Sequence, residues 1–117
     1  MFQKMLQGGG SAENFVQSGT TPISTESFQK ISTPFKPNKV LINIYKSSTY
    51  GITFIIDRDS SNVALASGTY KEGSSSGVIQ SINYSQYFRF LDDGFEFSGG
   101  HSGATEYGAA WDYTATV

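Results

Sequence analysis

The sequence of 117 residues contains no cysteine and a single histidine, His101. Disulfide frameworks, thiolate zinc sites and histidine clusters are therefore excluded as a source of stability or catalysis. Without cross-links the fold must be held by packing, and cysteine usage gives no information about the redox compartment. The length suffices for one domain and is too short for two independent cores.

Charge is also scarce. Charged residues make up only 15% of the chain, and its eight basic residues are dispersed. Sequence-independent binding to nucleic acid requires a positive stripe that displaces counterions, so a net charge of −2 predicts no nucleic-acid partner. No apolar run approaches the length that crosses a bilayer, and the first residues lack the apolar stretch of a signal peptide. We therefore expect no membrane partner and synthesis in the cytoplasm.

The residues that are abundant favour strands and turns. Aromatic residues account for 15% of the chain, and 17 serines, 10 threonines and 13 glycines together make up about a third of it. Such a mixture is poor in helix formers and rich in residues that suit pleated sheets and tight turns. The composition predicts an all-β protein with a core built from aromatic rings.

Residues 1–24 are predicted to form an amino-terminal arm and linker. Phe2, Met5 and Leu6 can share one side of a short helix or an extended segment, and a glycine triplet at 8–10 then provides a hinge. Two interpretations remain open. These three apolar side chains anchor the chain in a neighbouring subunit, or the segment is a disordered terminus or lies on the protein's own surface.

Residues 25–117 are predicted to form an antiparallel β-sandwich of about seven or eight short strands. The clearest alternation spans residues 39–47 and 50–57, which form the expected central hairpin. Val40, Ile42 and Ile44 fall on one face of its first strand. The other strands are expected at 25–33, 63–70, 78–82, 87–91, 95–97 and 109–117, with residues 71–77 as a loop.

A tight-turn signal at residues 92–94 (Asp-Asp-Gly) separates two short aromatic strands. Side chains at alternate positions of these strands should meet across the pair, and these are Phe88, Phe90, Phe95 and Phe97. Cross-strand aromatic contacts of this kind add roughly 0.2 to 1 kcal/mol each, which matters in a small core.

Paired carboxylates are the first candidates for acid–base chemistry. Asp57 lies near Asp59, and Asp92 is next to Asp93, but both pairs fall in predicted hairpin turns. Aspartate is selected in such turns because its side chain bonds to nearby backbone N–H groups. The first pair also lacks the central glycine and distant glutamate of a calcium loop. We therefore predict no catalytic, cofactor or metal site.

Surface contact is the remaining candidate role for individual side chains. His101 sits in a Gly/Ser segment that matches neither a catalytic serine elbow nor a phosphate-binding loop. Tyr107, Trp111 and Tyr113 follow it, and aromatic faces of this kind can bind sugar rings. Core packing is the stronger expectation for Trp111, but His101, Tyr107 and Trp111 all stay candidates for contact with a ligand.

Two segments resemble the small β domains of bacteriophage tail fibres and related virion appendages. Residues 35–40 (Phe-Lys-Pro-Asn-Lys-Val), followed by an alternating strand, are similar to the opening of such domains. Residues 90–97 (Phe-Leu-Asp-Asp-Gly-Phe-Glu-Phe) and 111–115 (Trp-Asp-Tyr-Thr-Ala) are similar to their turn and closing aromatic strand. The order and spacing of these segments cover roughly residues 27–117.

The resemblance implies a non-enzymatic structural protein of a virion, either associated with the tail or decorating the head. It further implies a homo-oligomer that contacts other virion proteins through the amino-terminal arm and displays the sandwich outward. A free-standing module that binds a host surface glycan is the alternative from a different functional class.

Overall fold

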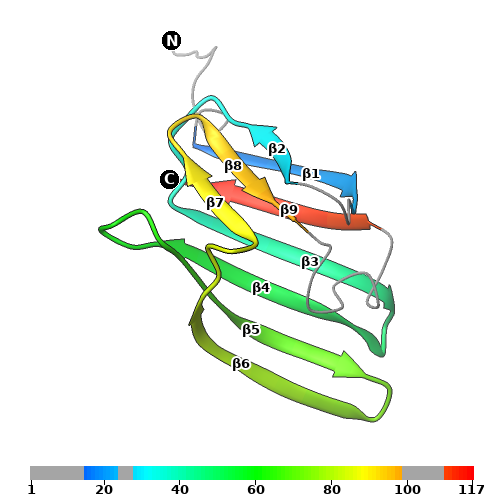
Figure 1. The fold of residues 1–117 in the computed structure, drawn as a ribbon. Helices are drawn as coiled ribbons and strands as arrows, with labels where there is room; N and C mark the ends of the chain where they lie inside the picture. The colour runs from blue at the N-terminus through cyan, green and yellow to red at the C-terminus, as the bar shows by residue number, and fades with distance from the viewer. Residues whose placement is uncertain (1–14, 24–27, 99–109) are drawn as a thin grey trace.

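The computed structural model describes residues 15–23, 28–98 and 110–117 (Figure 1). It confirms the all-β antiparallel sandwich, in which two sheets enclose one hydrophobic core. The described ranges contain no helix that is long and apolar enough to cross a membrane. Phe2, Met5, Leu6, His101 and Tyr107 lie outside the described residues.

The sandwich has a larger and a smaller sheet, and every strand pair is antiparallel. The larger sheet has the strand order β1 (Val16–Pro22), β9 (Ala110–Thr116), β3 (Lys39–Ser47), β4 (Tyr50–Arg58), β5 (Ala64–Glu72) and β6 (Ser75–Asn83). The smaller sheet has the order β2 (Gln29–Ser32), β8 (Gly94–Phe97) and β7 (Phe88–Leu91). Figure 1 shows the smaller sheet over one end of the larger sheet, with β5 and β6 extending beyond it.

The central hairpin predicted from the alternating sequence is confirmed as β3 and β4. Val40, Ile42 and Ile44 are fully buried, whereas the residues between them face the opposite side of the sheet. Because side chains alternate along a strand, three β-branched residues at every second position cover one face of β3 with apolar surface. This face lies against the smaller sheet.

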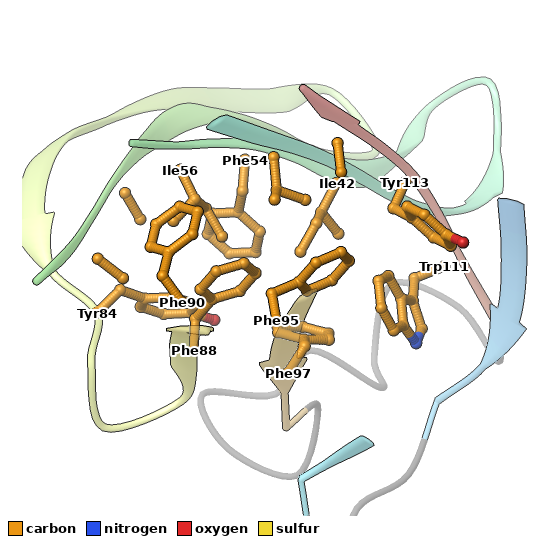
Figure 2. Close-up of a cluster of buried hydrophobic side chains, with 14 of the residues drawn as sticks. Ile42, Phe54, Ile56, Tyr84, Phe88, Phe90, Phe95, Phe97, Trp111 and Tyr113 are labelled. Carbon is orange, nitrogen blue, oxygen red and sulfur yellow. The ribbon is translucent and has the colours of Figure 1, made fainter. Parts of the chain in front are cut away.

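Aromatic rings from both sheets form the core (Figure 2). The predicted meeting of the four phenylalanines is confirmed, since β7 and β8 pair Phe88 with Phe97 and Phe90 with Phe95. Phe88 and Phe95 are stacked with ring centroids 5.2 Å apart. Contacts between the sheets come from β8 and β9, where Phe97 meets Trp111 edge-on at 4.9 Å. Offset and edge-on arrangements of this kind are favourable beyond the area that they bury.

The sandwich begins earlier in the chain than predicted. Residues 16–22, assigned from the sequence to the arm and linker, form β1 and pair with β9 along its whole length. These residues are polar, so apolar alternation did not reveal the strand. It packs on β9 through polar side-chain contacts: Ser18 bonds to the Thr114 hydroxyl at 3.0 Å, and the Thr20 hydroxyl donates to Asp112 at 2.7 Å. β1 is thus a strand beyond the eight that we expected.

The expected loop at residues 71–77 is also replaced by strand. β5 continues to Glu72 and β6 begins at Ser75, so only Gly73 and Ser74 form the turn. Gly73 has a φ of 66°, and glycine is favoured at the first central position of tight hairpin turns for this reason. The run of serines and glycines was mistaken for a long loop because it lacks apolar alternation.

Both ends of the described sandwich lie at one corner. β1 and β9 are antiparallel neighbours, and Val16 pairs with Thr116. Beyond the strands, the backbone N–H of Val117 donates to the carbonyl of Phe15 at 3.3 Å. The chain therefore enters and leaves the fold side by side.

Candidate functional site

Of the first carboxylate pair, only Asp59 lies in the turn predicted for both, and it has the structural role expected there. Asp59 accepts hydrogen bonds from the backbone N–H groups of Ser61 and Val63, both at 2.8 Å. Asp57 lies at the end of β4, 3.7 Å from the ammonium group of Lys39. The Asp59 side chain therefore closes the turn between β4 and β5 by satisfying backbone donors.

The second pair occupies the two-residue turn between β7 and β8. Asp92 lies 3.8 Å from Lys36 and Asp93 lies 3.4 Å from Lys30, and each of the four side chains is about half exposed or more. Exposed ion pairs of this kind contribute little to stability. Among the described residues, no three His, Cys, Asp or Glu side chains are grouped so that they could hold a metal ion.

Trp111 is not a surface contact, which corrects one of the sequence-based candidates. Its side chain is 0% exposed and packs against Phe95, Phe97 and Tyr113. The indole N–H donates to the Gln29 side chain at 3.3 Å, so its polar group is satisfied within the protein. The closing strand presents this side chain to the core, and no sugar ring can reach its face.

Arg58 was not singled out from the sequence, although it connects three parts of the fold. Its guanidinium donates to the carbonyl oxygen of Pro37 (2.6 Å from Nη2 and 3.0 Å from Nε) and to that of Leu91 (2.6 Å). It also lies over the Phe90 ring, with its central carbon 4.8 Å from the ring centroid. Partial burial lowers the pKa of Arg58 and Asp92 opposes that shift, but the group stays charged at physiological pH.

A small notch lies on the outer face of the larger sheet, the side that turns away from the smaller sheet. Strand register places Tyr45 opposite Gly51, and Gly51 opposite Lys71, so three neighbouring strands form one row across the sheet. The middle position of this row has no side chain. A cavity of about 180 Å³ results, bounded by Tyr45 and Lys71 and closed at one end by the β3–β4 turn.

Polar side chains form the next row along the same face. Asn43 lies opposite Thr53, which in turn lies opposite Thr69. The Thr53 hydroxyl donates to the Asn43 carbonyl oxygen at 2.7 Å. No other side-chain hydrogen bond of Asn43 occurs within the described part of the chain, so its amide N–H groups remain available. We call these six residues the outer-face notch: Asn43, Tyr45, Gly51, Thr53, Thr69 and Lys71.

The exposed edge of the larger sheet is a second candidate. β6 pairs with β5 on one side, and no described strand pairs with its other side. None of its nine residues is charged or a proline, and Val78 and Ile82 are 70% and 45% exposed. Natural proteins usually protect such an edge with charge, proline or an irregularity. In β6 the irregularity is a register shift at residues 80–81, and Ser75–Ile79 remain regularly paired with β5.

Comparison with known proteins supplies no relative, since no family model, curated protein or solved structure matches the chain. The functional argument therefore rests on the residues themselves. Sequence reasoning identified neither the outer-face notch nor the β6 edge, because both depend on which strands become neighbours. The predicted β3–β4 hairpin would have placed Lys46 opposite Gly51, and the register shift between Tyr45 and Ser47 brings Tyr45 there instead. Nothing in the sequence indicated that Lys71 completes the row.

Proposed function

We propose that this chain is a non-enzymatic structural protein of a bacteriophage virion. In this role several copies display the sandwich on the particle, and the amino-terminal arm docks on other virion proteins. The sequence resemblance at residues 35–40 and 90–97 supports the class of protein. The sandwich supports it in general terms, because a single ring-packed core beneath a Ser/Thr-rich surface suits a domain that must remain soluble while displayed.

The observation that carries the proposal is the open edge of β6. A strand with unpaired backbone groups is a template for another strand, and pairing along the edge extends the sheet. The occupant that fits is a second copy of the same strand. β6 has no charged residue, so antiparallel pairing with its own copy places no like charges opposite each other, and a two-fold contact is self-complementary.

The direct test is the composition of purified particles produced from the genome that encodes the chain. We expect mass spectrometry to detect the chain in several copies per particle. Its absence from particles would overturn the proposal. The role of the arm is tested separately by Phe2→Ser, Met5→Ser and Leu6→Ser together, which should reduce incorporation, with Gln3→Ser and Gln7→Ser as the control.

The edge contact has its own test in the purified chain. We expect sedimentation to show concentration-dependent self-association, which Val78→Lys abolishes because two like charges then meet near the axis of the contact. Ser48→Lys adds the same charge at an exposed turn and should leave association unchanged. A wild-type chain that stays monomeric at high concentration would contradict the β6 contact while leaving the particle experiment to decide the virion role.

A glycan-binding module is the second candidate function. The geometry now favours a different location from that expected, because Trp111 is buried and the outer-face notch carries an exposed tyrosine.

A further inference from the structure

We propose that the outer-face notch binds a pyranose ring that carries a carboxylate, as in a uronic or sialic acid. The proposal does not depend on the virion role, because the notch is formed by β3, β4, β5 and the β3–β4 turn of one chain.

Tyr45 provides the wall on which a sugar ring can pack. Its side chain is 61% exposed, which leaves a large aromatic surface in contact with solvent beside the cavity. The face of an aromatic ring is electron-rich, so it attracts the weakly positive C–H groups on the apolar side of a pyranose. The Tyr45 hydroxyl reaches Asp112 at 3.5 Å, which directs the ring toward β9 and away from the floor of the notch.

Gly51 provides the floor. No side chain fits at this position, because a Cβ built there would lie 2.8 Å from the Tyr45 Cβ and 2.9 Å from the Ile44 carbonyl oxygen. The cavity therefore lies beside the close approach of β3 to β4, between the side chains of Tyr45 and Lys71. The cavity of about 180 Å³ is smaller than the ~300–1,000 Å³ that encloses a whole drug-sized molecule, so it suits one ring of a longer chain.

The polar row supplies partners for the ring hydroxyls. Asn43 is oriented by the hydrogen bond that its carbonyl accepts from Thr53, so its amide N–H groups are left to donate. The Thr69 hydroxyl can donate or accept, and it lines the same cavity. Few, well-placed polar groups beside an aromatic surface are typical of sites that recognise small polar ligands.

Lys71 supplies the preference for a negative charge. It is the one charged residue among those that line the notch, and it makes no ion pair within the described residues. Asp112, the carboxylate that Tyr45 reaches, accepts a hydrogen bond from Thr20 at 2.7 Å and lies opposite Asn43 on β9, at the other end of the row of strands from Lys71 on β5. A carboxylate on the ligand can therefore pair with Lys71 across the notch.

The experiment is a titration of the full chain followed by backbone amide NMR, with methyl β-glucuronide as the probe and methyl β-glucoside as its neutral match. We expect both to shift the amide signals of Gly51, Thr53 and Thr69, with the glucuronide binding more tightly. That preference should shrink as salt is added, because the charges are solvent-exposed and therefore screened. Equal affinities would overturn the acidic ligand, and the absence of shifts at these residues would overturn the site.

Variants separate the two contributions. Tyr45→Ala should weaken binding of both sugars roughly fivefold to tenfold, whereas Tyr45→Phe keeps the ring and should retain binding. Lys71→Gln should remove the preference, so that glucuronide and glucoside bind this variant with equal affinity. Val78→Ser changes an exposed residue outside the notch and is the control. Binding that survives Tyr45→Ala unchanged would contradict the proposed contact, provided the remaining amide signals show an intact fold.

Discussion

β3 and β6 are strands of the same sheet and of equal length, nine residues each, yet they have opposite surroundings. β3 lies between two strands and beneath the smaller sheet, and it alternates buried and outward-facing residues over its first half. β6 has one neighbour, and none of its residues is buried. The backbone geometry is shared, so the difference comes from what covers each strand.

The molecule thus has a covered part, which holds the core, and an uncovered part around β6. Fully buried rings and β-branched side chains gather where the smaller sheet lies over β9, β3 and β4. The edge strand β6 of the larger sheet instead carries Ser, Gly and isolated exposed apolar residues. Substitutions in the two parts should therefore differ sharply in their effect on the free energy of unfolding.

The largest effect is expected from Phe95→Ala in the covered part. Phe95 is fully buried between Phe88 and Tyr113, and truncating a phenylalanine in a packed core typically costs about 3–5 kcal/mol. Val78→Ala in β6 should cost less than about 0.5 kcal/mol, because that side chain is largely exposed. Denaturant unfolding of both variants measures the difference, and equal losses would refute the division between the two parts.

Arg58→Met is expected to have the next largest effect. It leaves the carbonyl oxygens of Pro37 and Leu91 without their side-chain donors, and an unsatisfied buried acceptor costs about 1–3 kcal/mol. Arg89→Met is the matched control, since Arg89 is more exposed and 3.8 Å from its partner Glu96. If denaturant unfolding shows a loss for Arg89→Met as large as for Arg58→Met, the cost does not come from the carbonyl contacts of Arg58.

Tyr84 offers a smaller effect that depends on pH. Its ring lies at the boundary of the core, 5.2 Å from that of Phe54, and burial raises the pKa of its hydroxyl above the ordinary value of 10, with Tyr87 adding to the shift. The unfolded chain therefore loses this proton first as pH rises. The contribution of this pKa difference to the free energy of unfolding is fully present below about pH 9 and declines above about pH 10.

Tyr84→Phe should accordingly flatten the alkaline decline in the free energy of unfolding, measured by denaturant titrations across that range. Tyr45→Phe removes an exposed hydroxyl instead and should leave the slope as it is in the wild type. If the two substitutions flatten the decline equally, the burial of Tyr84 is not the source of the effect.

The smallest effect is expected from the ion pair between Lys39 and Asp57. Their charged atoms are 3.7 Å apart and more than half of each side chain is exposed. A double-mutant cycle with Lys39→Gln and Asp57→Asn should give a coupling below about 1 kcal/mol that weakens further in high salt. A larger coupling would mean that this ion pair contributes more to stability than its exposure indicates.

Local patterns in the sequence were sufficient for the strands whose side chains are sorted by burial. The alternation of Val40, Ile42 and Ile44 correctly predicted the buried face of β3. The turn signal at residues 92–94 correctly predicted that the four phenylalanines of β7 and β8 meet across the strand pair. β1 and the first part of β6 were missed because Ser, Thr and Gly carry no apolar alternation. Their strand geometry is set by neighbours far along the chain rather than by local periodicity.

The candidate site was less predictable for a related reason. Tyr45 and Lys71 are separated by 26 positions, and only the two registers that meet at Gly51 bring them to opposite sides of one notch. Arg58 likewise bonds to carbonyl groups, which every residue possesses and which therefore leave no mark in the sequence. Trp111 lies in the core, which confirms the stronger of the two expectations for it and removes it as a candidate ligand contact.

The shared corner of β1 and β9 has a practical consequence for moving this domain between proteins. Because Phe15 and Val117 are hydrogen-bonded neighbours, a short linker can join them and give a circular permutant with new termini at Gly73 and Ser74. The same closeness lets the sandwich be inserted into a surface loop of a carrier protein, because the two junctions with the carrier lie next to each other.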